Sequence, residues 1–249
     1  MNKIPVRHTQ YTKDNNPIKL MGHHTGGTDI YPLADTSHHT AEIIRSWHLS
    51  KVWFKNGIKY IGWDDIGYHW VFEQDGVVVA GRPEDYHGAH VKKGNVNFES
   101  VGIVFSGNFD RPINSINHTP SEKQKESFKQ WYAGDLEEYY IFDVQGNKVK
   151  VQNKIGNFIS RFPHITPDKI EPHRNYSNKT CWGNNLDNFW LADLAQEALN
   201  EHKEKNVYSN EDIDACYAIL EKQKKKIEEK DTLISLLVKL IRDAFSKIK

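Results

Sequence analysis

The sequence predicts an α/β fold, with a mixed central β-sheet flanked by helices and followed by a C-terminal helical tail, which is either a coiled coil or a helix along its own domain. Short apolar runs typical of strands are interspersed with amphipathic segments between residues 18 and 199, which is the pattern of a sheet covered by helices. Asp75-Gly76 separates two such runs, and an Asp-Gly pair between strands is a strong hairpin signal. Beyond residue 212, isoleucine and leucine recur every seven residues, which is typical of a coiled-coil helix.

The first third of the chain predicts an arm, a strand and a helix. Residues 1–17 are polar and predict an arm that wraps the domain or stays loose, and Ile18–Met21 is a short strand that ends at a glycine-rich turn, GHHTGG. Thr40–His48 has apolar residues on one helical face. The aromatic, glycine-punctuated stretch 53–63 predicts a loop or a short hairpin.

Strands and helices continue to alternate up to residue 199. Residues 66–73 and 77–82 are the two strands of the Asp-Gly hairpin, and 100–108 is a buried strand. A helix opens near Thr119–Ser121 and is expected to run to about Tyr140. The remaining predicted elements are a small hairpin over 141–151, a helical stretch over 155–162 and a final helix over 186–199.

The composition and net charge of the chain exclude some classes of function. The chain has 249 residues and a formal net charge of +0, so no general electrostatic attraction draws it to nucleic acid or acidic lipid. Its two cysteines are not a disulfide framework and fit a reducing compartment. The N-terminus lacks an apolar signal region and no run spans a membrane. We therefore expect synthesis in the cytoplasm without a signal peptide.

The sequence predicts three segments: a domain over 1–200, a charged linker over 201–212 and an amphipathic helix over 213–249. The helix could join copies of the chain into a homo-oligomer or lie along its own domain. Membrane-surface contact by residues 233–249 is a weaker alternative, because charge on a short helix discriminates poorly. The heptad seam is Ile213, Leu220, Ile227, Ile234, Ile241 and Ile248, and its companion positions, Cys216, Gln223, Lys230, Leu237 and Ala244, are half polar.

The loop Glu171–Gly183 carries the residues that suggest a metal centre. His173 and Cys181 lie on it, and Lys179 precedes the cysteine by two residues. Imidazole and thiolate are ligands that Zn²⁺ favours, although a lone His near a lone Cys is more often structural. A catalytic zinc needs three protein ligands and one open position. A histidine of the distant GHHTGG turn could supply the third ligand.

Taken together, these stretches resemble the type 2 N-acetylmuramoyl-L-alanine amidases, which include the amidase-type phage lysozymes and the peptidoglycan recognition proteins. The resemblance runs from about Ile18 to Leu199. Each motif is weak alone, but their shared order is specific. The motifs are GHHTGG, RSWH, GWDDIGYHWVFEQDG, AGRP, GAH, NFESVGIVFSGNF and PHRNYSNKTC.

The resemblance implies roles for particular residues. His23, His173 and Cys181 would be the zinc ligands, Tyr68 the active-site tyrosine, and Lys179 the residue that stabilises charge on the reacting carbonyl. Relatives that lack the cysteine bind peptidoglycan without cutting it, so Cys181 favours an enzyme.

The sequence also departs from the family pattern. Trp182 stands where proline usually follows the ligand cysteine, and Val104 stands where some phage members carry a glutamate. The insertion 52–61 and a longer stretch over 141–151 are expected to reshape the substrate groove. Among the other histidines, we expect His24, and His90 with Asn97, to border the groove, His48 to pack under its helix, and His69 to face away from Tyr68.

The implied function is zinc-dependent hydrolysis of the amide between N-acetylmuramic acid and the L-Ala of the peptidoglycan stem peptide. The missing signal peptide favours a phage or prophage endolysin that acts on the bacterial cell wall, or a wall-recycling enzyme. The alternatives are a non-catalytic peptidoglycan-binding module and a wall-anchored assembly protein.

Overall fold

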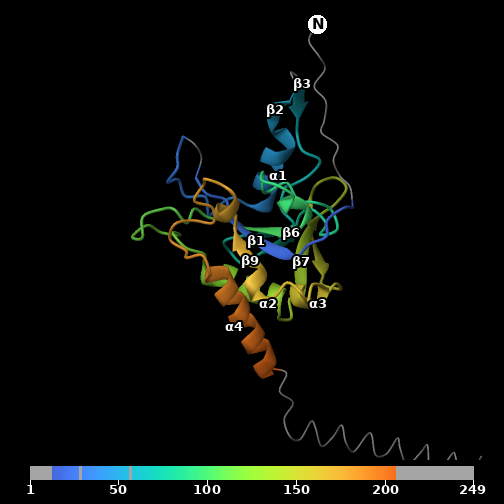
Figure 1. Cartoon of the computed structure of the whole chain (residues 1–249), viewed down its shortest axis with the longest axis vertical. Helices are drawn as coiled ribbons and strands as arrows, with labels where there is room; N and C mark the ends of the chain where they lie inside the picture. Colours follow the sequence, from blue (N-terminus) through green and yellow to red (C-terminus); the bar gives the residue numbers. More distant parts are fainter. Residues whose placement is uncertain (1–12, 28–29, 56–57, 206–249) are drawn as a thin grey trace, which may run out of the picture. The chain divides into compact units, whose positions relative to one another are not determined.

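The computed structural model describes residues 13–27, 30–55 and 58–205, and within them a seven-stranded mixed sheet organises the fold (Figure 1). Its strand order is β8-β7-β5-β4-β6-β1-β9. The adjacent strands β4, β6, β1 and β9 run parallel to one another, whereas β4–β5 and β7–β8 are antiparallel hairpins. The predicted mixed sheet is thus confirmed. The strands are β1 (Lys19–His24), β4 (Trp70–Phe72), β5 (Val78–Ala80), β6 (Ser100–Phe105), β7 (Glu138–Phe142), β8 (Lys148–Gln152) and β9 (Ile170–Pro172).

Helices cover both faces of this sheet. The helix α1 (Ala41–Ser50) lies on one face, and α2 (Glu122–Tyr132), α3 (Phe158–Arg161) and α4 (Trp190–Lys205) lie on the other (Figure 1). Three short 3₁₀ helices, η1 (Val96–Phe98), η2 (Pro167–Lys169) and η3 (His173–Tyr176), lie in the connections. This arrangement confirms the flanking helices predicted from the sequence.

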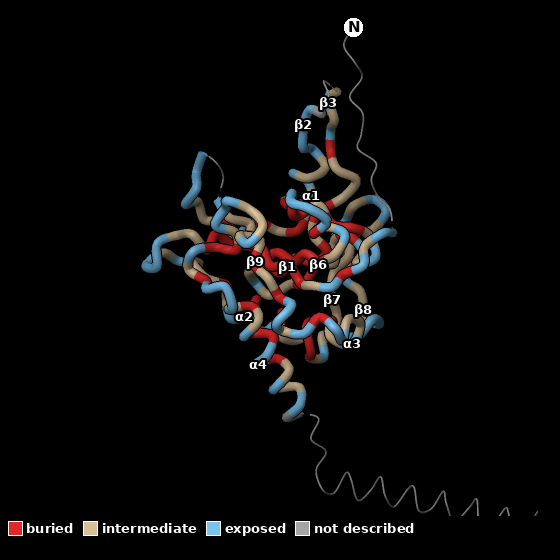
Figure 2. Tube along the Cα trace, in the orientation of Figure 1, coloured by how far each residue is buried: buried red, intermediate tan, exposed pale blue. Residues whose placement is uncertain are grey.

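Figure 2 shows that the central strands are buried. Their side chains alternate between two apolar cores, one on each face of the sheet. Phe72 and Phe105 stack on each other, with ring centroids 5.0 Å apart, and pack with Phe128 of α2. Val71 and Val104 point to the opposite face and share a cluster with α1. Continuous apolar runs such as 100–105 follow from this double burial.

The helix α2 begins as predicted but ends earlier. Ser121 caps it in a reciprocal capping box with Gln124. The expectation that the helix continues to about Tyr140 was wrong, because it ends at Tyr132 and residues 138–142 form β7. The run EYYIF pairs with β8 across a turn that contains Gly146 at φ 86°. Strand pairing therefore prevails over helix propensity here.

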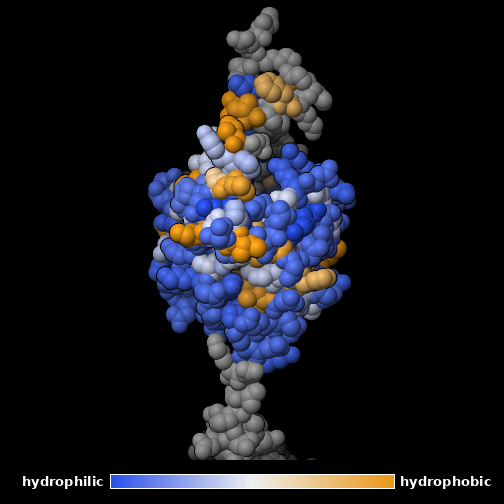
Figure 3. Space-filling model, turned by 90° about the vertical axis from the view of Figure 1, so that its left-hand side faces the viewer, coloured by the Kyte–Doolittle hydropathy of each residue, from blue (hydrophilic) through white to orange (hydrophobic). Residues whose placement is uncertain are grey.

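The insertion 52–61 forms a two-stranded antiparallel hairpin, β2 (Val52–Lys55) and β3 (Ile58–Ile61), which confirms one of its two expected forms. It carries exposed apolar side chains, among them Phe54 with 70% of its surface accessible. Figure 3 shows hydrophobic surface at the upper end of the molecule, where Figure 1 places β2 and β3.

The described part of the N-terminal arm agrees with one of its two expected forms, an arm that wraps the domain. Residues 13–17 join the fold, since Asn15 and Asn16 hydrogen-bond to the backbone of the 84–100 region. At the other end, α4 runs on to Lys205, past the expected helix end at Leu199. None of the helices among the described residues is long and apolar enough to cross a bilayer.

The chain divides into two compact units, residues 1–202 and 203–249. Residues 206–249 lie outside the described part of the chain. The predicted coiled coil, homo-oligomer contact and membrane contact all fall there and stay predictions, as does the division into domain, linker and tail.

Candidate metal centre

Two neighbouring parallel strands bring the predicted histidine ligands together. His23 lies near the carboxyl end of β1, and His173 directly follows β9. In the β1–β9 register Gly22 faces Pro172, so the next residue on each strand is one of these histidines. Their ring centroids are 4.6 Å apart. Carboxyl ends of parallel strands meet at one edge of a sheet, which is where open α/β folds place their chemistry.

Cys181 reaches the same point on a loop that a buried tryptophan anchors. The next residue, Trp182, is 2% exposed and packs in the main core. A Cβ atom on Gly22 would lie 2.4 Å from the Trp182 ring, so β1 needs glycine there. Asp110 holds the loop on both sides of the cysteine, because it accepts hydrogen bonds from the Thr180 hydroxyl and the Asn184 backbone N–H.

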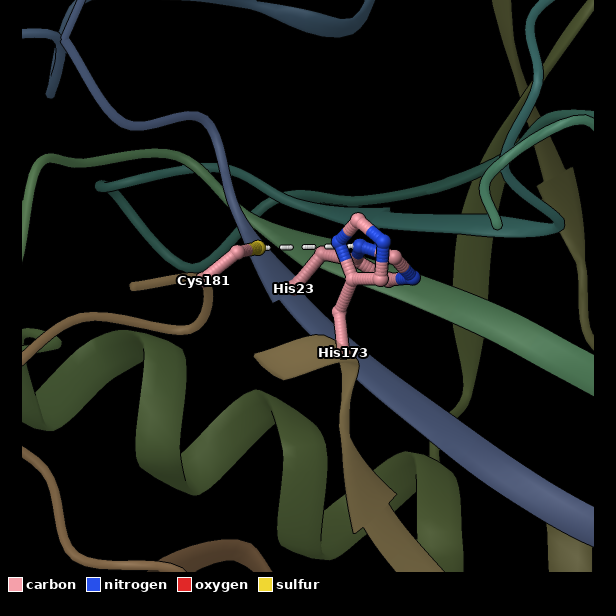
Figure 4. A group of neighbouring side chains, drawn as sticks. All are labelled: His23, His173 and Cys181. Carbon is pink, nitrogen blue, oxygen red and sulfur yellow. Dashed lines mark hydrogen bonds between the residues drawn. The ribbon is translucent and has the colours of Figure 1, made fainter. Parts of the chain in front are cut away.

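The donor atoms of these three residues converge (Figure 4). Cys181 Sγ lies 3.7 Å from His23 Nδ1, and one donor atom from each of His23, His173 and Cys181 lies within 4.8 Å of the others. A tetrahedral zinc with Zn–S of about 2.3 Å and Zn–N of about 2.0–2.1 Å separates its donors by roughly 3.3–3.6 Å. The donor set and its spacing therefore fit Zn²⁺.

Burial keeps the ligands in their uncharged forms when no metal is bound. Burial lowers the pKa of His23 well below its usual value, and the neighbouring His90 and His173 act in the same direction. Burial, with a contribution from Lys179, lowers the pKa of His173 to about 4. Burial raises the pKa of the Cys181 thiol to about 12. The imidazoles are thus ready to bind a metal at neutral pH, whereas the thiol must release its proton on binding.

A cavity of about 770 Å³ opens at one of the three ligands, His173. Tyr68 and Lys179 both line it, together with His173. The Tyr68 ring lies 5.1 Å from the His23 ring, and burial raises the pKa of its phenol. The structure thus brings all five predicted site residues to one place.

The other histidines occupy positions that differ in part from expectation. His48 was expected to pack under its helix, but it lines the cavity and stacks on Trp63, with ring centroids 4.5 Å apart. His24 is buried rather than at the groove, and its Nδ1 accepts the Phe109 N–H. His90 and Asn97 line the cavity as expected.

Two residues that sequence reasoning did not single out support the centre. Asp110 holds the cysteine loop, and Ser100 lies behind His90 at a distance of 3.5 Å from its Nε2. Neither stands in a motif with ligand spacing, so only the fold reveals them. Val104 pairs with His23 in the β1–β6 register and is fully buried, so it offers no proton acceptor at the position where some relatives carry a carboxylate.

The family model described as N-acetylmuramoyl-L-alanine amidase matches residues 13–184, which include the sheet, the three converging ligands and the cavity. The chain belongs to this amidase family.

Individual relatives match shorter stretches of the chain. It is 40% identical over 82 residues to an endolysin of Klebsiella phage KP32, and 38% identical over 82 residues to one of Escherichia phage T7. Each match covers 32% of this chain and 46% of the relative, so the chain spans about half the length of the curated relatives it matches. Over 50 residues, 20% of this chain and 26% of the relative, it is 44% identical to peptidoglycan-recognition protein SC2 of Drosophila melanogaster.

Solved structures with similar folds include the N-acetylmuramoyl-L-alanine amidase LysC from Clostridium intestinale. That likeness has a TM-score of 0.47 and 21% identity, and covers 79% of this chain and 93% of LysC. A bumblebee PGRP-SA structure has a TM-score of 0.42 and 23% identity, with 74% of this chain and 86% of that chain covered.

Proposed function

We propose that this amidase is a zinc-dependent peptidoglycan hydrolase that cleaves the amide between N-acetylmuramic acid and the L-Ala of the stem peptide. We further propose that it acts on the bacterial cell wall as a phage or prophage endolysin. The observation that carries the proposal is the convergence of His23, His173 and Cys181 beside an open cavity. The family membership and the endolysin relatives support the same reaction.

The three ligands leave one position of a tetrahedral zinc for water or substrate, as catalytic sites require. Zinc, when bound there, supplies Lewis-acid polarisation of the scissile carbonyl and activation of the attacking water. The chain's own residues must then bind the stem peptide in the cavity and stabilise the negative charge that develops on the carbonyl oxygen.

Tyr68 and Lys179 are suited to that second task. Because burial raises the pKa of Tyr68, its phenol is a hydrogen-bond donor at neutral pH in the metal-free protein. The positive charge of a bound zinc would oppose this shift. Lys179 is exposed on the cysteine loop and lines the same cavity, so its ammonium can approach a bound substrate from the solvent side.

The test of this function is the chemistry of the products. Purified peptidoglycan is incubated with the wild-type protein, and free L-Ala amino termini and new reducing sugar ends are measured alongside the zinc content. The proposal expects about one zinc per chain, new amino termini without reducing ends, and loss of activity on chelation that added zinc restores. Binding to peptidoglycan without cleavage would instead make the domain a receptor or anchor.

Lys179→Ala is expected to slow hydrolysis without abolishing it. Loss of one group that stabilises an oxyanion costs about 10²–10³ in kcat in other hydrolases. Zinc content should stay at the wild-type level, since Lys179 is not a ligand. Steady-state kinetics on a defined muropeptide, with zinc measured on the same samples, checks this.

The matched control is Lys169→Ala, which removes an exposed lysine of η2 outside the cavity lining and should leave kcat unchanged. An unchanged rate in Lys179→Ala, or a loss of zinc together with activity, would contradict the assigned role.

A further inference from the structure

A line of hydrogen bonds starts at Nε2 of His23, the ring nitrogen opposite the one that faces Cys181. His23 Nε2 lies 3.0 Å from His90 Nδ1, and His90 Nε2 lies 3.5 Å from Ser100 Oγ. The Ser100 hydroxyl donates to the Val96 carbonyl oxygen at 2.5 Å. His23 and Ser100 are 1% and 0% exposed, and His90 is 8% exposed, so this line lies inside the protein.

The carbonyl at the far end sets the direction of the whole line. A carbonyl oxygen can only accept a hydrogen bond, so the single hydroxyl proton of Ser100 is used in the hydrogen bond to the Val96 carbonyl. Ser100 Oγ must therefore accept from His90, which places the His90 proton on Nε2. The remaining nitrogen of a neutral His90, Nδ1, is then an acceptor, and it takes the Nε2–H of His23.

This hydrogen bond also determines whether the other ring nitrogen of His23, Nδ1, carries a proton. A neutral imidazole with its proton on Nε2 has a bare lone pair on Nδ1. Nδ1 is the atom that faces Cys181 Sγ at 3.7 Å. The line of hydrogen bonds thus selects the one tautomer of His23 that can bind a metal between His173 and Cys181.

We propose that His90, oriented by Ser100, is a positioning residue that holds His23 in its metal-binding tautomer and ring orientation. This inference rests on the proposed zinc site. Metal-bound histidines commonly donate their second ring N–H to a carboxylate, a carbonyl or water. In this protein the imidazole of His90 accepts that N–H.

The surrounding structure is built to hold the His90 ring. A Cβ atom on Gly88 would lie 2.2 Å from this ring, and one on Gly102 would lie 2.4 Å from it, so both positions make room for it. The Asn97 side chain accepts the backbone N–H groups of His90 and Val91 and donates to the Val91 carbonyl. Burial lowers the pKa of His90, and the nearby His69, His173 and Arg82 act in the same direction, so the ring carries a single proton.

The test compares the zinc dissociation constants of variants of the whole chain, measured by competition with a chelator. Truncation in His90→Ala should weaken zinc binding about 10- to 100-fold, the usual effect of losing such a partner. His90→Asn should restore most of the affinity, because its Oδ1 can occupy the place of Nδ1. His90→Gln fills a similar volume but puts its amide near the Nε2 position, so it should bind zinc as weakly as His90→Ala.

Thermal unfolding of each metal-free variant separates positioning from general packing. His39→Ala is the control, since it removes an equally buried imidazole, 9% exposed, whose ring neighbours are His38 and Trp47. It should lose stability without losing zinc affinity. If His90→Ala does not fold, the difference in zinc affinity between His90→Asn and His90→Gln tests the proposal instead.

Equal zinc affinity in the Asn and Gln variants, or wild-type affinity in His90→Ala, would overturn the role of His90 and leave the zinc amidase intact. A wild-type protein that binds no zinc would overturn the proposed function and this inference together. The two failures are therefore distinguishable.

Discussion

Cys181→Ser is expected to abolish peptidoglycan hydrolysis and to deplete the protein of zinc. The substitution exchanges a soft thiolate for a hydroxyl that stays protonated at neutral pH and binds Zn²⁺ poorly. Two histidines then remain as ligands, which is one fewer than catalytic zinc sites use. The fold should survive, because Trp182 and Asp110 hold this loop independently of the sulfur.

The measurement is zinc content and release of L-Ala amino termini on the same preparation, with binding to insoluble peptidoglycan as a separate readout. Binding should persist, since the cavity lining is unchanged. Cys216→Ser is the matched control, because it removes the other of the two cysteines in the sequence and should keep both zinc and activity. Wild-type turnover by a zinc-loaded Cys181→Ser protein would rule out Cys181 as a required ligand.

The sequence was sufficient to predict the residues that converge, through the loop that carries His173 and Cys181 and through the resemblance to the amidase family, which singled out His23. His23 ends a short apolar run, and His173 and Cys181 share one polar loop. Since β1 and β9 are adjacent and parallel, residues at their carboxyl ends meet without any further adjustment. Parallel pairing of β1 with β9 therefore brings the two histidines of the candidate metal centre together.

Other features depend on contacts between residues far apart in the chain. The end of α2 at Tyr132 follows from the pairing of β7 with β8. The local sequence pattern alone does not indicate this pairing. The line from His23 through His90 to Ser100 joins three segments, and its direction comes from a backbone carbonyl that no side-chain motif records. His48 lines the cavity because Trp63, beyond the inserted hairpin, stacks on it.

Acid is expected to destabilise the domain well above the pH at which carboxylates titrate. His24, His48 and His69 each accept a backbone N–H at Nδ1, from Phe109, Gly67 and Gly102. A proton on that nitrogen would turn the acceptor into a donor facing another donor. Burial, the largest cause in each case, lowers the pKa of all three to about 4, against an ordinary value of 6.5.

The sign of the effect follows from proton binding. Between pH 6.5 and about 4 the unfolded chain binds protons at these histidines and the folded chain does not, so the free energy of unfolding falls as the pH falls. Each histidine lowers the free energy of unfolding by up to about 1.4 kcal/mol per pH unit. For three histidines this loss is large compared with the roughly 5–15 kcal/mol that stabilises a domain. The raised pKa of Glu73 acts in the opposite direction and offsets part of the loss.

Urea unfolding of the chelator-treated protein between pH 7 and pH 4.5 measures this dependence without the metal. Asp35 and Asp143, whose pKa values lie below 3.8, keep their contributions in this range. His69→Asn retains an acceptor for the Gly102 N–H but does not titrate, so its stability should fall less steeply, by about 1.4 kcal/mol per pH unit. A wild-type free energy that is flat from pH 7 to pH 5, or identical slopes in the two proteins, would show that these histidines do not stay neutral inside the fold.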